Sequence, residues 1–277
     1  MRQKGLVQKT TLSILLSCGA LLNLFPLYLT VVTSFKTYSD SLKSFFTLPS
    51  QPTLDNYLTV FSTTKFGTFF ANSSVITIVS CSVIILSSPL VSYAIARNRD
   101  KLYYRFLYNY IIAGTFIPFQ VVMLPLVFVM SRLGIMDIPG VILLYITLAL
   151  HQSVFLYVGY FNSVPIALEE AAYIDGCGIL KTFFLVTYPL IKPMTATVLI
   201  LNALWIWNDF LLPLVMLNAN PRIWTLPLFL FNFKTQYTFQ FNLAFASFVL
   251  TMIPIMVTYL FLQRYIINGL TGGALKS

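Results

Sequence analysis

The sequence contains few charged residues and few of the residue patterns that perform chemistry. Only 9% of its 277 residues are charged, whereas a soluble domain has about a quarter. The single histidine, His151, excludes the H-E-x-x-H zinc motif, and no G-x-S-x-G nucleophile motif occurs. Because Cys18, Cys81 and Cys177 lack C-x-x-C spacing, they indicate neither a disulfide framework nor a zinc site. We therefore expect neither catalytic nor metal-binding residues.

Patterns for binding nucleotides or nucleic acids are also missing. The sequence G-x-x-x-x-G-K-[ST] does not occur, so any ATP that drives this protein must bind to another chain. The net charge of +9 could attract a polyanion, but no basic run is interleaved with aromatic residues as in a nucleic-acid interface. The basic residues lie between apolar segments instead, which indicates a role in membrane topology.

Six long apolar segments make up most of the remaining sequence. Hydrophobic residues account for 58% of the chain, and the mean hydropathy is +0.82. Each segment is long enough for the roughly 20 helical residues that cross a bilayer, which predicts an all-α polytopic membrane protein with six transmembrane helices. The expected helices cover residues of about 12–32, 72–96, 106–130, 140–161, 194–216 and 242–263.

Two of these expected helices, the third and the first, carry residues that affect how they are interpreted. In the third, Pro118 and Pro125 predict a kink or a break, because proline lacks the N–H that a helix needs. The first follows a basic start, as the apolar part of a signal peptide does. Its apolar run continues well past Cys18 without a small-residue cleavage site, so an uncleaved membrane helix is favoured.

The distribution of Lys and Arg predicts the orientation in the membrane. With the N-terminus in the cytoplasm, eleven of the 17 Lys and Arg residues lie on the cytoplasmic side and six lie outside. The positive-inside rule favours this arrangement over its inverse. It divides the chain into a first helix with an extracellular loop (1–71), a transmembrane core (72–263) that contains a cytoplasmic region (164–193), and a cytoplasmic tail (264–277).

Residues 164–193 are the longest polar interruption in the second half of the chain. Pro165 suits the first position of a helix, and Gly176 is suited to a left-handed cap at its end. A second helix is expected at 179–187, ended by Tyr188-Pro189. The spacing predicts two faces on the first helix, which are Ile166, Glu169, Glu170 and Tyr173, and Leu168, Ala171, Ala172 and Asp175.

The spacing in this region resembles the EAA signature of ABC importer permeases. Glu170-Ala171-Ala172 is followed by Gly176, Val186 and Tyr188-Pro189, where the usual motif has Ile and Leu at the positions of Val186 and Tyr188. The resemblance implies a cytoplasmic element that docks on an ATPase subunit. An amphipathic loop lying on the membrane is the alternative, but it predicts basic residues where this helix carries acids. The expected coupling residues are Glu169, Glu170, Ala171, Ala172, Asp175, Gly176 and Pro189.

In the fifth expected helix, Asn202, Trp205 and Asp209 share one face. An ionised Asp in lipid costs about 2.5–3.5 kcal/mol, so Asp209 should face a cavity, a partner or an interface. An aromatic ring beside hydrogen-bonding groups suits a sugar, which makes these residues candidates for a substrate pathway. Alternatively, the tryptophans belong to the aromatic belt and Asp209 packs near the headgroups. We interpret His151 as a packed histidine rather than as a ligand.

Over the whole chain, the sequence resembles the six-helix permease subunit of carbohydrate ABC importers of the maltose and multiple-sugar type. This implies a type I ABC importer permease fold in a bacterial plasma membrane, with both termini in the cytoplasm. Thr271, Gly272 and Gly273 in the tail would then reach the ATPase subunits. The resemblance rests on Ile174-Asp175-Gly176, Trp207-Asn208-Asp209-Phe210, Pro52–Tyr57 and the tail Gly269–Lys276.

The resemblance also implies partners and a substrate. The chain would be a transport subunit and not an enzyme, paired with a homologous permease, two ATPase subunits and an extracellular solute-binding protein. It would bind no cofactor itself, because ATP and Mg would be held by the ATPase subunits. The expected substrate is a di- or oligosaccharide of the raffinose or maltose type, and a sugar-phosphate ester such as glycerol 3-phosphate is the alternative. A different class, an ion-coupled secondary transporter, needs intramembrane ionisable residues, for which Asp209 and His151 are the only candidates.

Overall fold

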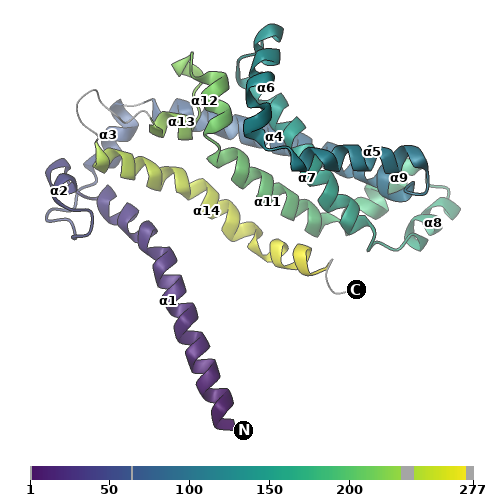
Figure 1. The fold of residues 1–277 in the computed structure, drawn as a ribbon, viewed down its shortest axis with the longest axis horizontal. Coiled ribbons are helices and arrows are strands. Elements are labelled where there is room, and N and C mark those ends of the chain that lie inside the picture. Colours follow the sequence, from purple (N-terminus) through teal and green to yellow (C-terminus); the bar gives the residue numbers. More distant parts are fainter. Residues whose placement is uncertain (1, 64, 232–239, 273–277) are drawn as a thin grey trace. The chain divides into compact units, whose positions relative to one another are not determined.

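The computed structural model describes residues 2–63, 65–231 and 240–272, and every regular element in these ranges is a helix (Figure 1). The predicted all-α fold class is thereby confirmed. The longer helices are α1 (Arg2–Ser34), α4 (Phe66–Arg97), α5 (Leu102–Ala113), α6 (Phe119–Leu133), α7 (Ile138–Phe161), α11 (Lys192–Asn208) and α14 (Phe241–Gly272). The shorter ones are α2 (Tyr38–Lys43), α3 (Asp55–Thr63), η1 (Gly114–Phe116), α8 (Ala167–Ile174), α9 (Ile179–Thr182), η2 (Phe183–Thr187), α10 (Tyr188–Leu190), α12 (Leu211–Leu217), η3 (Pro221–Ile223) and α13 (Leu226–Phe231).

The described residues contain six membrane spans when each bent pair of helices counts as one span. Four helices, α1, α4, α7 and α14, are each long and apolar enough to cross a bilayer alone. The other two spans are residues 102–116 with 119–133, bent by 104°, and residues 179–190 with 192–208, bent by 76°. The predicted number of transmembrane segments agrees with this arrangement.

The third span is broken at the first of its two prolines. Ile117 is extended, with φ −96° and ψ 110°, as is typical of the residue before a proline. Pro118 directly precedes α6, whereas Pro125 lies inside α6 without ending it. In Figure 1, α6 therefore leaves the direction of α5 sharply. This break opens a space beside α7.

The single helix expected at 194–216 is broken in the structure. Its first part, α11, ends at Asn208, Asp209 is extended with φ −70° and ψ 129°, and α12 begins at Leu211. Pro213 explains the break, because in a continuous helix its ring would collide with the carbonyl group of Asp209. The side chain of Asp209 forms a local turn before α12, since its Oδ1 accepts a hydrogen bond of 3.0 Å from the N–H of Leu211.

The chain divides into two units, residues 1–67 with 229–254 and residues 68–228 with 255–277. In the second unit, α7 is the central helix and packs against α5, α11 and α12. Its large side chains Tyr145, Tyr157 and Phe161 are fully buried. An apolar helix that is buried on several sides provides a fixed frame against which the other helices of this unit are positioned.

In the first unit, the segment after α1 has more structure than the sequence predicted, because α2 and α3 both form there. Buried Asn56 connects its parts. The Nδ2 of Asn56 donates hydrogen bonds of 2.8 Å to the carbonyl oxygens of Ser34 and Lys36, and its Oδ1 accepts one of 2.7 Å from Asn242. The Nζ of Lys36 donates to the carbonyl oxygen of Ser44 at 2.8 Å, and burial lowers the pKa of this lysine.

Gly140, at the start of α7, is expected to tolerate no side chain. A Cβ added there would lie 1.9 Å from the carbonyl oxygen of Ile135, so Gly140→Ala should lower the free energy of unfolding by about 1–3 kcal/mol. Gly159 on the same helix is a matched control, because no atom lies within 4 Å of an added Cβ. Gly159→Ala should stabilise the helix by about 0.5–1 kcal/mol. Thermal unfolding of both variants in lipid nanodiscs gives the comparison, and equal effects would contradict it.

Candidate functional site

Region 164–193, for which the sequence predicts a cytoplasmic position, folds into two helical segments joined by a glycine turn. Gly176 has φ +82°, and its N–H donates to the carbonyl oxygen of Tyr173 at 3.0 Å, while the N–H of Cys177 donates to that of Ala172 at 2.9 Å. This is the Schellman arrangement that favours glycine at the left-handed position. The left-handed cap expected at Gly176 is confirmed.

The second segment continues further than the sequence predicted. Instead of ending at Tyr188-Pro189, α9 passes into the wider π turn η2 and then into α10, which extends to Leu190. The wider turn directly precedes α10, which contains Pro189, whose missing N–H and bulky ring would disturb an ordinary α-helical turn. Pro189 is thus built into the segment and does not terminate it.

Glu169 is buried inside the protein rather than displayed beside Glu170. Only 3% of Glu169 is exposed, and its Oε1 lies 2.7 Å from Nη2 of Arg97 at the end of α4. The Nε of Arg97 adds hydrogen bonds of 3.0 and 3.2 Å to the two carboxylate oxygens. The hydroxyls of Tyr93 and Thr187 also donate to the carboxylate, at 2.8 and 3.3 Å. The expected face that grouped Glu169 with Glu170 is therefore wrong, since Glu169 faces inward from α8.

Arg97 has two further acceptors at the end of α7. Its Nη1 donates to the carbonyl oxygen of Phe161 and its Nη2 to that of Val164, each at 3.2 Å. One guanidinium thus connects α4, the end of α7 and α8. Sequence reasoning treated Arg97 only as a cytoplasmic charge. The sequence signal that could have revealed this pair is the spacing of Glu169 and Ala172, which places both on one face of a helix. If that face is buried, the carboxylate needs a cationic partner.

The opposite side of the region is an exposed surface with both apolar and acidic residues. Ile174 is 87% exposed, and Glu170, Ala171 and Asp175 are also exposed. Ile179 and Leu180 at the start of α9 are exposed as well, so both apolar and acidic side chains of this region are available to a partner. We define the coupling surface as Glu170, Ala171, Ile174, Asp175, Ile179 and Leu180.

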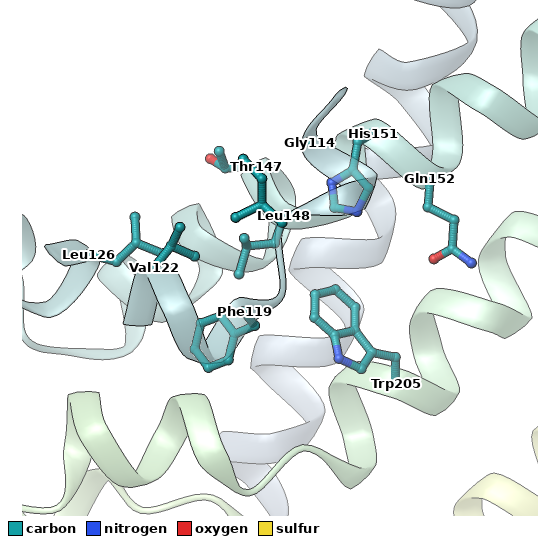
Figure 2. A pocket seen from close by; sticks show the side chains of 10 residues that line it. Gly114, Phe119, Val122, Leu126, Thr147, Leu148, His151, Gln152 and Trp205 are labelled. Atoms are coloured by element: carbon teal, nitrogen blue, oxygen red, sulfur yellow. The ribbon is translucent and has the colours of Figure 1, made fainter. Parts of the chain in front are cut away.

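A separate cavity of about 460 Å³ lies within the second unit, beside the break between η1 and α6 (Figure 2). Residues from η1, α6, α7 and α11 line it, including Phe119, Thr147, His151, Gln152 and Trp205. The rings of Phe119, His151 and Trp205 point toward the same space in Figure 2. His151, interpreted from the sequence as a packed residue, thus borders a cavity.

A smaller cavity of about 180 Å³ adjoins this one and shares Phe119, Leu148 and Trp205 with it. Gln120 and Asp209 line the smaller cavity. Trp205 therefore lies between two hollows, one lined by His151 and Gln152 and the other by Asp209.

The three residues expected on one substrate-facing side of the fifth helix do not remain together. Trp205 and Asp209 border the cavities, but Asn202 is only 3% exposed and faces α7. Its Nδ2 donates to the carbonyl oxygen of Val198 at 2.8 Å and to the hydroxyl of Ser153 at 3.4 Å. The shared face was wrong for Asn202, because a helix face predicted from spacing does not reveal which neighbouring helix covers it.

Asp209 and Trp205 are both held by one residue of α7. The hydroxyl of Tyr145 donates to Oδ2 of Asp209 at 2.9 Å. The ring of Tyr145 meets that of Trp205 edge to face, with 5.4 Å between the ring centroids. Fully buried Tyr145 thereby fixes the indole ring at the wall of the cavity. These contacts hold Asp209 within this unit, and its position near the headgroups stays a prediction.

The predicted ATPase contact in the tail is only partly within the described residues. The backbone of Thr271 and Gly272 forms the last positions of α14. Gly273 lies outside the described residues, so this contact stays a prediction.

Comparisons with known proteins agree on one family. A family model described as "Binding-protein-dependent transport system inner membrane component" matches residues 88–272. The chain is 45% identical over 265 residues to the multiple sugar-binding transport system permease protein MsmG of Streptococcus mutans, with 95% of each chain covered. It is 31% identical over 277 residues to the melibiose/raffinose/stachyose import permease protein MelC of Bacillus subtilis, with 99% of this chain and 98% of that relative covered.

A solved structure supports the fold independently. The crystal structure of a bacterial ABC transporter involved in the import of the acidic polysaccharide alginate contains a chain that matches this one with a TM-score of 0.80. The alignment covers 94% of this chain and 96% of that chain, at 24% sequence identity. At this identity the match establishes the fold alone.

Proposed function

The chain belongs to the family of binding-protein-dependent transport system inner membrane components, and we propose that it is a permease subunit that imports a di- or oligosaccharide of the raffinose or maltose type. Family membership makes it a multi-pass membrane subunit of an ABC importer, which works with a second permease, an ATPase and a solute-binding protein. The ion-coupled secondary transporter considered from the sequence is therefore set aside.

The character of the cavity supports a neutral sugar over a phosphate ester. Aromatic rings and uncharged polar groups line the larger cavity, and its lining residues include no Lys or Arg. A phosphate group is normally recognised by such cations. Similarity to the multiple sugar-binding and the melibiose/raffinose/stachyose permeases favours the same substrate class.

The observation that carries the coupling function is the exposed coupling surface on a helix that is internally tied to the membrane spans. We infer that closure of two ATPase subunits, which hold ATP and Mg, moves α8 through Glu170, Ala171 and Asp175. The Glu169–Arg97 pair then transmits this movement to α4 and α7. Ala172, Gly176 and Pro189 would maintain the shape of the region, and Thr271, Gly272 and Gly273 would add contacts from the tail.

Transport by the complete complex tests this function. The subunit is reconstituted in liposomes with its partner permease, ATPase and solute-binding protein, and uptake of radiolabelled raffinose is measured. We expect uptake to continue when ionophores collapse the proton and sodium gradients and to stop when ATP is replaced by a non-hydrolysable analogue. Glycerol 3-phosphate should neither be imported nor compete. Uptake that follows an ion gradient, or a preference for glycerol 3-phosphate, would contradict the proposal.

A further inference from the structure

The larger cavity has the features of a ligand site within this subunit. We propose that it binds one glycosyl ring of the transported neutral sugar, with Trp205 and Phe119 against the apolar face of the ring and His151 and Gln152 bonded to its hydroxyls. This inference rests on the proposed function. It adds the residues through which this chain touches the substrate.

Three separate parts of the fold border the space. The break before Pro118 turns α6 away from α5 by 104° and places Phe119 at one wall. Gly114 faces α7 closely, since a Cβ added there would lie 3.6 Å from the Cβ of His151. On the remaining side, α11 contributes Trp205. The cavity is therefore a product of the fold and does not depend on the placement of one flexible side chain.

The principal aromatic wall is fixed before any ligand arrives. Trp205 packs edge to face against Tyr145, which is itself held by Asp209 at 2.9 Å. About two fifths of Trp205 is nevertheless exposed, so the indole offers a free surface to the cavity. A side chain that is already held in its binding position loses little conformational entropy when a ligand binds.

The lining chemistry matches a ring that has apolar faces and hydroxyl groups at its edge. Trp205 and Phe119 provide flat apolar surfaces, while Gln152 offers both hydrogen-bond donors and an acceptor, and His151 offers ring nitrogens. The lining residues of this cavity include no Asp, Glu, Lys or Arg, which favours an uncharged ligand. A few polar groups among apolar walls are typical of sites that orient small molecules.

The size of the space is consistent with this assignment. Its volume of about 460 Å³ lies in the range of roughly 300–1,000 Å³ found for small-molecule sites. The adjoining 180 Å³ cavity continues past Trp205 toward Gln120 and Asp209. A further hydroxyl-bearing part of an oligosaccharide can therefore extend from the bound ring in this direction.

Transport by cavity variants tests the site in the complete reconstituted complex. Trp205→Ala is expected to lower the maximal rate of raffinose uptake about three- to tenfold, because an aromatic contact is lost. Trp205→Phe should retain most of the rate, and Gln152→Leu should lower it. Phe155→Ala is the control for loss of an aromatic ring, because Phe155 is exposed on α7, the helix that carries Gln152, and lies outside the lining. It should transport at the wild-type rate.

Chemical labelling locates the sugar independently of the rate. Cys18, Cys81 and Cys177 are first replaced by alanine, and a single cysteine is introduced as Thr147→Cys in the cavity or as Phe155→Cys outside it. Raffinose, delivered by the binding protein in the presence of ATP, should slow maleimide labelling at position 147 several-fold and leave position 155 unaffected.

The possible outcomes separate this site from the general function. Wild-type import combined with unchanged rates in Trp205→Ala and Gln152→Leu would overturn the site and leave the transporter intact. The same holds if position 147 is shielded equally with and without raffinose, since the partner permease would then fill the cavity. A wild-type complex that hydrolyses ATP but imports no sugar would overturn the proposed function together with the site.

Discussion

In the Arg97→Met variant, the free energy of unfolding is expected to fall by about 3–5 kcal/mol, because the carboxylate of Glu169 would remain buried without its cation. The side chains of Arg97 and Glu169 are only 13% and 4% exposed, and their closest atoms are 2.7 Å apart. The variant also removes the bonds to the carbonyl oxygens of Phe161 and Val164. Thermal unfolding of the purified subunit in nanodiscs measures the loss.

A double-mutant cycle distinguishes the ion pair from general packing. Glu169→Gln alone should cost less than Arg97→Met, because the amide oxygen still accepts hydrogen bonds from Arg97 and Tyr93. Combining both substitutions should recover part of the stability, since no unpaired charge then remains in the interior. Strictly additive losses in the double variant would contradict a direct coupling between the two residues.

The position of this pair gives it a consequence for transport as well as for stability. Arg97 lies at the end of one transmembrane helix and bonds to the end of another, while Glu169 belongs to the helix that carries the coupling surface. If the proposed function holds, we expect a displacement of α8 to pass to α4 and α7 through these hydrogen bonds, which a nearly buried site shields from water. Sugar-stimulated ATPase activity in the folded double variant should remain below that of the wild type.

Glu170→Lys and Ile174→Asp are expected to abolish most of the sugar-stimulated ATPase activity while the subunit still folds. Both residues are exposed, so their replacement should change the free energy of unfolding by less than about 0.5 kcal/mol. When the ATPase docks, Ile174 would be buried as a central apolar contact. The loss of such a contact typically costs about 2 kcal/mol or more of binding free energy. This corresponds to a loss of roughly 30-fold in affinity for the ATPase.

Lys101→Glu provides the matched control for this experiment. It reverses an exposed charge in the turn after α4, outside the coupling surface. Co-purification with the ATPase subunit and stimulated hydrolysis should both stay near wild-type values in this variant. Normal stimulation in Glu170→Lys and Ile174→Asp would show that the coupling surface is an ordinary solvated surface of the region.

The sequence predicted the membrane spans well because their cause is local. A run of about 20 apolar residues can satisfy its backbone hydrogen bonds in lipid only as a helix, whatever surrounds it. The break at Pro118 was also predictable, since a proline acts on its own turn and on the residue before it. The same rule applied to Pro213 would have predicted the break at Asp209, but the apolar run of the fifth segment concealed it.

In the coupling region (164–193), the sequence predicted the turn but not the burial of the individual side chains. Its glycine cap follows from the conformational freedom of Gly176, which the sequence reveals. The opposite environments of neighbouring Glu169 and Glu170 do not follow in the same way, because they depend on Arg97, 72 residues away from Glu169 in the chain. Periodicity gives the spacing of a helix face but not the side that the protein covers.

By itself, the sequence determined the class of the protein and its apolar helical spans, because hydrophobicity and turn residues act over short distances. The orientation in the membrane and the coupling role of region 164–193 stay predictions from charge distribution and motif spacing. The tertiary structure alone decided which side chains meet. It turned Asn202 toward α7, paired Tyr145 with Asp209 across 64 residues, and gathered Phe119, His151 and Trp205 around one cavity. These contacts arise from the packing of distant helices, which no local pattern of residues specifies.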